Sequence, residues 1–546
     1  MPLDDLVLAL QRGLDRLVRR LRIGPAPAPG PRRRLLIIQI DGLSRSVLEQ
    51  ALREGRMPFL ARLLHRSHRM EPMTVGMPTS TPAFQMAAMY GTRPDIPGFH
   101  FHDKRRRADV YFPRAGDAAL VEREQSQGRP GIVSGGSTYG CVFTGGALNN
   151  LFSFAMIKRP TGRGVLTALS ALFVLLWVVV KGLTLSAIAI VRFLMRILAN
   201  PLVARPSGWK WLAIKIGMSI WMRELFTLSA SRDLYAGAPA VYVNYLDYDV
   251  YSHGFGPRDR RARRALRRVD AAMHQLWRVC RRVPEHAYDV YVLSDHGQAH
   301  CTPFHVLTGG RPLEKLLFEE FFSDGGEQEV SPGRPRGRHL ASGIKAVRSH
   351  RGNGLFQRFM NYLDEDFGAT IEAVPESAER HGIRVICAGP NAFVYFVDTP
   401  EPLTTAAIDA RYPDLIEELS RRRGIGFVLA RGPQGPVCGF RGKRYDLRDE
   451  AGPFAGRDDL PVVLDGLRDL MAMRTAGDLV IYGQEATDGD VSYIAEVGAH
   501  AGPSHDELHT FIVAPRGAAL PAPILHPLQL YDVFIRYQQT ADTVAA

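Results

Sequence analysis

The sequence predicts an α/β fold with a mostly parallel central sheet, helices on both of its faces, and a hydrophobic helical insert. Short β-branched runs alternate with helical patterns, several of these runs end in acidic or histidine residues, and a long apolar segment interrupts the series. Of the 546 residues, 46% are hydrophobic and 23% are charged. That composition indicates a folded protein, built either as one large domain with insertions or as two to three domains.

The strand predictions rest on short β-branched and aromatic runs that end in polar residues. Helical patterns at 44–65 and 258–282 lie between these runs. Alternation of strands and helices is typical of a parallel sheet that is covered on both faces. The predicted strands are 34–41, 240–249, 288–296, 392–397, 477–483 and 510–515.

The charge of the chain indicates which kind of partner it binds, and its cysteines indicate the redox compartment. The formal net charge of +12 comes mostly from arginine clusters at the N-terminus, at 104–107 and at 258–268, which favours an anionic membrane surface or a phosphorylated substrate. We expect no nucleic-acid partner, because the chain has neither finger spacing nor an aromatic-studded basic motif. The five cysteines are scattered without a CxxC pair, which argues against a disulfide framework or a thiolate zinc site and favours reducing conditions.

Acidic and histidine residues recur where predicted strands end. In open α/β sheets, ligands bind outside the carboxyl ends of the strands, so these side chains are expected to gather there. Each residue alone has a plain explanation as a turn, a cap or a surface pair, but their joint placement favours a metal site. Mixed carboxylates and imidazoles suit zinc or manganese, and six ligands are enough for two ions. The candidates are Asp41, Asp249, His253, Asp295, His296 and His500.

A nucleophile is predicted in "GMPTSTPAFQ" (76–85). Thr81 is expected to be the N-cap of a helix that has Pro82 at its first position and ends at Gly91. The free N–H groups of a helix start attract a phosphate and a developing alkoxide. A metal ion near Thr81 would lower the pKa of its hydroxyl and make it a covalent nucleophile, although a plain capping role would use the same residue.

In this order the motifs resemble those of the alkaline phosphatase superfamily, and most closely its type I phosphodiesterase and nucleotide pyrophosphatase branch. The resemblance is carried by Asp41-Gly, Thr81-Pro, "DVYSHGFGP" (249–257), "LSDHG" (293–297) and His500. It touches roughly 33–103, 238–310 and 477–516, and the segments 104–237 and 311–476 lie outside it. It implies an alkaline phosphatase-like fold, two divalent ions (zinc, or alternatively manganese) and a phosphoester substrate.

The resemblance also implies a role for each residue. Thr81 would attack phosphorus and form a phosphothreonine that water then releases. The family has an asparagine three residues after the nucleophile, where this chain has Phe84; Gln85 is the nearest amide, and these two are the candidate substrate contacts. Asp247 is expected to be a neighbouring acid. One ion would be held by Asp41, Thr81, Asp295 and His296, and the other by Asp249, His253 and His500.

The apolar insert suggests contact with a membrane. Residues 165–180 carry no charge but are short for a membrane span, and a buried core helix is the alternative interpretation. Arg192 and Arg196 interrupt the following apolar stretch, and 209–226 mixes tryptophan and lysine as interfacial segments do. Candidate ligands lie on both sides of the insert in the sequence. We therefore expect 165–200 to return as a hairpin or to lie on the bilayer, and not to cross it once.

The N-terminal segment 3–23 has leucines on one helical face and arginines off it. Two interpretations stay open: a basic amphipathic helix on an anionic membrane, or a helix packed on the protein or on a second subunit. No signal peptide is recognised and arginines flank the apolar insert, so we expect a membrane-associated protein with its catalytic part on the cytoplasmic side.

The expected function is that of a metal-dependent phosphoester hydrolase, of phosphodiesterase or nucleotide pyrophosphatase type, acting on a membrane-associated or amphiphilic phosphoester. A phosphotransferase, in which an acceptor hydroxyl replaces water, would use the same site. A catalytically silent membrane scaffold is the alternative of another class, and the intact ligand set argues against it.

These expectations divide the chain into six regions. The segment 324–354 is rich in glycine, proline and arginine and is predicted to be an exposed loop. The regions are a basic amphipathic helix with a Pro-rich linker (1–31), the first part of a catalytic α/β domain (32–163), the hydrophobic membrane-associated insert (164–237), the second part of the catalytic domain (238–310), an insert or cap region (311–476) and the C-terminal part of the catalytic domain (477–546).

Overall fold

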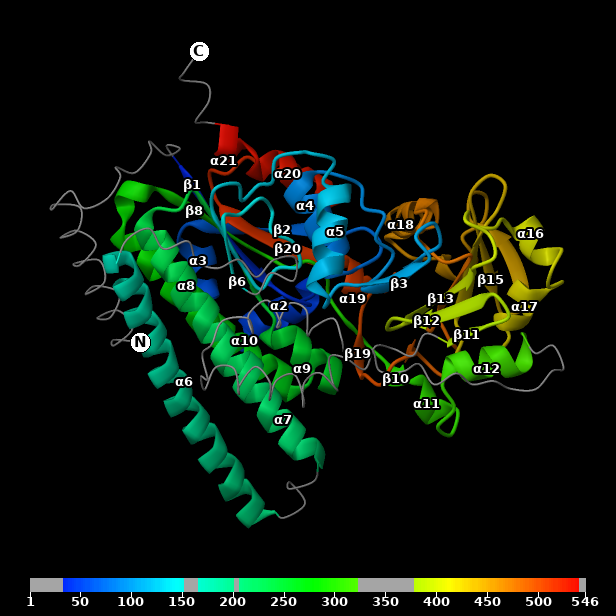
Figure 1. Cartoon of the computed structure of the whole chain (residues 1–546), viewed down its shortest axis with the longest axis horizontal. Helices are drawn as coiled ribbons and strands as arrows, with labels where there is room; N and C mark the ends of the chain where they lie inside the picture. Colours follow the sequence, from blue (N-terminus) through cyan, green and yellow to red (C-terminus); the bar gives the residue numbers. More distant parts are fainter. Residues whose placement is uncertain (1–32, 152–164, 201–205, 323–377, 540–546) are drawn as a thin grey trace.

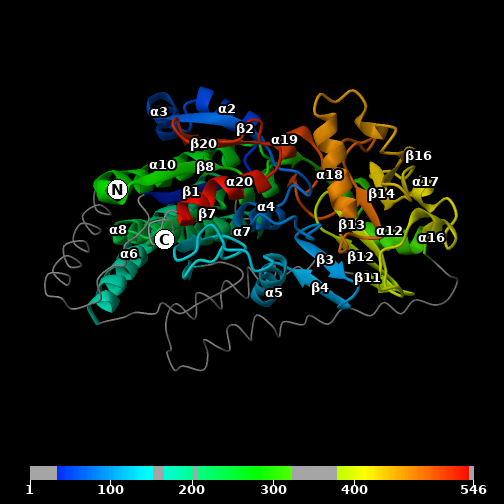
Figure 2. The same cartoon turned by 90° about the horizontal axis from the view of Figure 1, so that it is seen from above.

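The structure, a computed structural model, describes residues 33–151, 165–200, 206–322 and 378–539. The predicted N-terminal helix and the predicted loop at 324–354 lie outside these residues. Two seven-stranded sheets stand side by side, the first with most of the helices around it and the second at the right of Figure 1; Figure 2 shows the same arrangement from above.

The first sheet is mixed and has a parallel centre. β1 pairs in parallel with β7 and β8, and β5 and β6 continue in parallel beyond β7. On the other side β20 pairs antiparallel with β8, and β2 pairs antiparallel with β20. The predicted α/β fold is confirmed, with a mixed sheet. In spatial order its strands are β2 (His68–Thr74), β20 (His509–Pro515), β8 (Tyr288–Leu293), β1 (Arg34–Ile40), β7 (Ala240–Tyr245), β5 (Ser137–Tyr139) and β6 (Asn149–Leu151).

Alternate residues of the central strand supply two hydrophobic cores, because successive side chains of a strand point to opposite faces. Leu36, Ile38 and Ile40 of β1 join the core formed with α2, α3, α8 and α10, whereas Leu35 and Ile37 join the core formed with α4, α5 and α20. These helices are α2 (Arg45–Arg53), α3 (Pro58–Arg66), α4 (Thr81–Tyr90), α5 (Ala115–Gln125), α8 (Arg223–Ala236), α10 (Arg260–Arg282) and α20 (Leu528–Phe534).

The second sheet is antiparallel throughout. The strands predicted at 392–397 and 477–483 are found, as β13 and β17, but they pair with each other in this sheet and not in the first. The prediction that placed both in the parallel sheet is therefore wrong, because an apolar run does not record which sheet it joins. In spatial order the strands are β11 (Ala378–Arg380), β12 (Ile383–Cys387), β13 (Asn391–Phe396), β17 (Leu479–Tyr482), β14 (Phe427–Arg431), β15 (Pro436–Phe440) and β16 (Lys443–Asp446).

Contacts near β3 (His100–Asp103) and α18 (Leu460–Ala472) join the two sheets. Lys104 Nζ lies 3.0 Å from Asp478 Oδ2, and both side chains are buried. Met77, just before α4, packs with Leu467 and Leu470 of α18 in the core of the second sheet. Met77 thus packs with the second sheet, while α4, which follows it, packs with the first.

The apolar insert forms a helical hairpin. α6 (Val165–Ala199) is followed by α7 (Pro206–Ile216), a π-helical stretch (Gly217–Met222) and α8, which leads into β7. β5, before the hairpin, pairs with β7, after it, so the chain on both sides of the hairpin lies in one sheet. Among the described residues one helical stretch, Leu176–Ala199, is long and apolar enough to cross a membrane by length and composition.

Candidate metal centre

The carboxyl edge of the first sheet gathers the predicted residues, as expected for an α/β sheet. Asp41 follows β1, Asp295 and His296 follow β8, and Thr81 begins α4. His500 follows β19 (Gly498–Ala499), which pairs antiparallel with β9 (Ala299–His300). That short pairing fixes the His500 loop beside the loop that carries His296.

Thr81 is the first residue of α4, and Ser80 is the N-cap, which corrects the prediction that Thr81 would be the cap. The side chain of Ser80 makes no capping hydrogen bond. Thr81 Oγ1 is directed toward the centre instead, 3.2 Å from His296 Nε2 and 3.5 Å from Asp41 Oδ1. Its hydroxyl therefore faces Asp41 and His296.

Asp249 and His253 lie on a helix and not at a strand end, contrary to the prediction. β7 stops at Tyr245, and both residues belong to α9 (Asp247–Phe255). Residues four apart share one helical face, and His253 Nε2 lies 3.3 Å from Asp249 Oδ2. Asp247 is turned elsewhere: its Oδ1 accepts a hydrogen bond from Arg223 of α8 at 2.9 Å.

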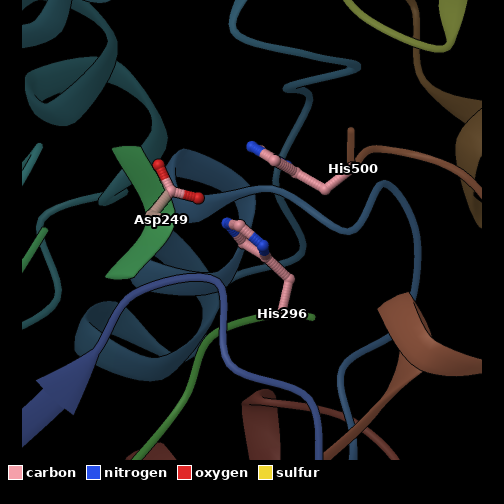
Figure 3. Close-up of side chains that lie close together, drawn as sticks. All are labelled: Asp249, His296 and His500. Atoms are coloured by element: carbon pink, nitrogen blue, oxygen red, sulfur yellow. The ribbon is translucent and has the colours of Figure 1, made fainter. Parts of the chain in front are cut away.

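The residues form two groups at different depths. The deep group, which is buried, is Asp41, Thr81, Asp295 and His296. The outer group, which is half-buried, is Asp249, His253 and His500. Ligand atoms of Asp41, Asp295 and His296 lie within 4.8 Å of one another, as do those of Asp249, His296 and His500. His296 thus links the groups, and its ring stacks on that of His500 at 3.8 Å (Figure 3).

The three histidines of the centre share one orientation. The Nδ1 atom of each has an acceptor outside the centre, so in the neutral ring Nδ1 carries the proton and Nε2 keeps its lone pair. Metal-binding histidines are oriented in this way by carboxylates and backbone carbonyls. The acceptors are Glu496 Oε2 for His253 (2.7 Å), the carbonyl oxygen of Gly297 for His296 (3.0 Å) and that of Thr79 for His500 (2.9 Å).

The carboxylates of the centre are crowded and their charge is not balanced. Asp295 Oδ2 is buried and has no hydrogen-bond partner among the described residues. Burial, followed by the charges of Asp295 and Asp249, raises the pKa of Asp41 well above its usual value, and burial also raises the pKa of Asp295. A divalent cation would occupy the free oxygen and balance the charge, so these residues fit a metal.

In the outer group, the pKa values of the two histidines are shifted in opposite directions. Burial, followed by the charges of His296 and His253, lowers the pKa of His500 well below its usual value and keeps the ring neutral. Burial also acts to lower the pKa of His253, but the carboxylates of Asp249 and Glu496 outweigh it and raise that pKa. A neutral imidazole is the form that binds a metal, so His500 is already in that form, whereas His253 would release a proton when an ion binds.

Three supporting residues were not predicted from the sequence. Asn244 Nδ2 donates to Asp41 Oδ2 at 2.7 Å, Gln298 Nε2 donates to Asp249 Oδ1, and Glu496 holds His253. A polar Asn244 inside an apolar strand was the one available signal. The partners of Gln298 and Glu496 come from distant segments and leave no local pattern.

The two predicted substrate contacts are not at the centre. Phe84 is buried in the core on the α4 side of the first sheet. Gln85 is also buried: its Nε2 donates to Gln39 Oε1 at 3.2 Å, and its Oε1 accepts from the backbone N–H of Val142 at 2.8 Å. On a helix, residues three and four positions after Thr81 return to the core face, so both predictions are corrected.

A third group of metal-ligand types lies outside the centre. Its members, Asp459, His505 and His509, are called the surface group below, and their ligand atoms also lie within 4.8 Å of one another. Asp459 is paired with Arg457 through two contacts of 2.7 and 2.8 Å, and it accepts a hydrogen bond from His509 Nε2 at 2.9 Å. Its charge is therefore balanced already.

Comparison with known proteins identifies one family. Residues 215–350 match the model of the type I phosphodiesterase / nucleotide pyrophosphatase family, which confirms the predicted resemblance over a span that includes Asp249, His253, Asp295 and His296. Two structures of phosphonoacetate hydrolase from Sinorhizobium meliloti 1021, with phosphonoformate and with phosphonoacetate, are similar at 14% and 13% identity, with TM-scores of 0.45 and 0.44. Each similarity covers 94% of this chain and 97% of the hydrolase. No curated protein matches the chain.

Proposed function

We propose that this relative of the type I phosphodiesterase / nucleotide pyrophosphatase family is a phosphodiesterase or phosphatase with Thr81 as its nucleophile. It would bind two divalent ions, zinc or manganese, and its substrate would be a membrane-associated or amphiphilic phosphoester. The observation that carries the proposal is the shared orientation of three histidines. The hydroxyl of Thr81 lies 3.2 Å from His296 Nε2 and 3.5 Å from Asp41 Oδ1. Ligand atoms of Asp249, Asp295 and His500 lie within 4.8 Å of one of His296, and Asp295 Oδ2 has no hydrogen-bond partner among the described residues.

The deep group and the outer group would each hold one ion. When bound, the ions balance the carboxylates, lower the pKa of the Thr81 hydroxyl and stabilise charge on the phosphoryl oxygens. Thr81 sits at the start of α4, where free N–H groups favour a phosphate. Its Oγ1 forms a bond to phosphorus as the ester oxygen leaves, and a water then takes the phosphoryl group from Thr81.

The test combines metal content with turnover. Wild type, Thr81→Ala and Thr81→Ser are measured by elemental analysis and by hydrolysis of a bis-aryl and a mono-aryl phosphate. We expect about two ions per chain in wild type. Thr81→Ala should lose on the order of 1000-fold in rate, whereas Thr81→Ser keeps a hydroxyl and retains part of the rate.

Two outcomes would overturn the proposal. If none of the three proteins binds stoichiometric metal and all show equal, negligible rates, the protein is not the proposed enzyme. Bound metal without turnover of either ester supports a silent scaffold instead. The preference between the two esters separates a diesterase from a monoesterase.

A further inference from the structure

The helix α6 is packed on one side only. Its buried residues recur every three or four positions and face α7 and α8, with Gly182 lying against the ring of Trp221. From Leu176 to Ala199, where the side chains are described, the rest of its surface is exposed and mostly apolar, which is unusual for a helix of a folded protein. The large exposed side chains are Leu176, Val180, Leu183, Ile188, Ile190, Val191, Leu194, Met195 and Leu198.

A cluster of positive charges borders this apolar face. Arg192 and Arg196 of α6 and Arg268 of α10 lie near Lys215 of α7. Burial, followed by the charges of the three arginines, lowers the pKa of Lys215. Arg192, Arg196 and Lys215 form no ion pair with the residues that the structure describes. We call these four residues the cationic flank. Arg268 also lies 3.9 Å from Asp247 Oδ1, so three of the four cations are without an ion pair among the described residues. Cations beside a broad apolar surface match the phosphates and acyl chains of an anionic bilayer.

The hairpin is in contact with α9, the helix that carries Asp249 and His253 of the outer group. Trp211 of α7 lies so close to Gly254 that a Cβ there would be 2.0 Å from the indole, and its ring is 4.1 Å from that of Phe255. Gly254 directly follows His253. A chain of ion pairs makes the same connection, from Lys181 through Glu224 and Arg223 to Asp247.

The hairpin also projects on the side of the centre. In Figure 1, α6 and α7 extend beyond α9 and away from the first sheet. Both ends of the hairpin return to the same sheet, so it can enter a bilayer only from one face.

We propose that the apolar face of α6 and the cationic flank seat this protein on an anionic phospholipid bilayer, with α9 and the metal centre at the headgroup level. The docking itself stands on the hairpin alone. The substrate class that follows from it, a phosphoester carried by a membrane lipid, rests on the proposed function.

The test uses the full chain and vesicles of phosphatidylcholine, with and without phosphatidylglycerol. Val191→Glu places a charge on the apolar face, where the side chain is 57% exposed. Val306→Glu is the matched control, since Val306 is 62% exposed on α11 (Phe304–Leu307). We expect Val191→Glu to lower vesicle partitioning at least about 10-fold and the control to leave it unchanged. Arg192→Ala with Arg196→Ala should lower partitioning on phosphatidylglycerol vesicles by about 30-fold.

Hydrolysis of the soluble bis-aryl phosphate is measured on every variant, so the two proposals can fail separately. Equal vesicle binding by wild type and Val191→Glu overturns the docking, even where hydrolysis is intact. If wild type and Val191→Glu differ in vesicle binding but neither hydrolyses the ester, the docking proposal stands. The proposed enzymatic function and the lipid substrate are then contradicted. A dimer that dissociates in Val191→Glu, with no binding to vesicles, shows that a second copy covers α6 and also overturns the proposal.

Discussion

The metal centre and the surface group hold the same kinds of side chain but differ in how charge is balanced. In the surface group the carboxylate of Asp459 is paired with Arg457 and His509, and its pKa is lowered to about 2: burial raises it, but the contacts with Arg457 and His509 outweigh burial. In the centre, Asp295 has a buried oxygen without a hydrogen-bond partner among the described residues, and the pKa of Asp41 is raised. Proximity of aspartate and histidine is therefore common to both groups, and the balance of buried charge is what distinguishes the candidate metal centre.

Replacement of one histidine from each group gives the largest expected difference. His500→Ala removes an Nε2 from the centre and should lower hydrolysis of the bis-aryl phosphate more than about 100-fold, since loss of residues that merely orient ligands already costs 10- to 100-fold. His505→Ala is the matched control and should stay within about 2-fold of wild type. Equal losses in the two variants would mean that the surface group also serves the reaction.

Chelation is expected to act on the centre alone. An ion present at about 100 times its dissociation constant stabilises the folded state by about 2.7 kcal/mol, and removal of the ion takes that away. Thermal unfolding with and without chelator should therefore shift in wild type and in His505→Ala. The shift should be much smaller in Asp295→Asn, which lacks the unbalanced charge. An undiminished shift in Asp295→Asn would place the ion elsewhere.

Acid should weaken the ion pair of Asp459 in the surface group. The pKa of Asp459 is depressed in the folded state, so its stabilising contribution is present above about pH 4 and is lost as the pH falls toward about 2. Discounted for solvent screening, Asp459→Asn should cost about 1 to 2 kcal/mol at neutral pH. Denaturant unfolding at several pH values measures it. A difference between wild type and variant that stays constant from pH 7 to pH 3 contradicts the ion pair.

The smallest expected effect comes from unbalancing the surface group. Arg457→Ala removes the partner of Asp459 and leaves a carboxylate beside two imidazoles, which suits zinc. We expect weak zinc binding at this group to become about 10-fold tighter, equivalent to about 1.4 kcal/mol. Calorimetric titration of protein whose centre is already loaded measures it, and Arg423→Ala, which removes a different exposed arginine paired with Asp488, is the control. No change would mean that geometry, and not charge, keeps zinc out.

The sequence predicts the positions of the deep-group residues better than those of the outer group and of the candidate substrate contacts. Asp41, Asp295 and His296 directly follow central parallel strands, and such strands bring their carboxyl ends to one edge whatever lies between them. Asp249 and His253 were expected at a strand end because the apolar run continues into α9, and a helix of only 9 residues shows no distinct periodicity. Gln85 was chosen by analogy with a family position, and only the direction of α4 shows that it faces the core.

The contact between Trp211 and Gly254 has an evolutionary consequence. The glycine after His253 belongs to the most specific motif of the sequence, yet the structure shows an indole from the hairpin lying where its side chain would be. Selection on position 254 is therefore selection on the hairpin as well as on the centre. A descendant that lost the hairpin would be free to accept alanine there, whereas one that kept Trp211 would not. The glycine and the tryptophan are expected to be inherited as a pair.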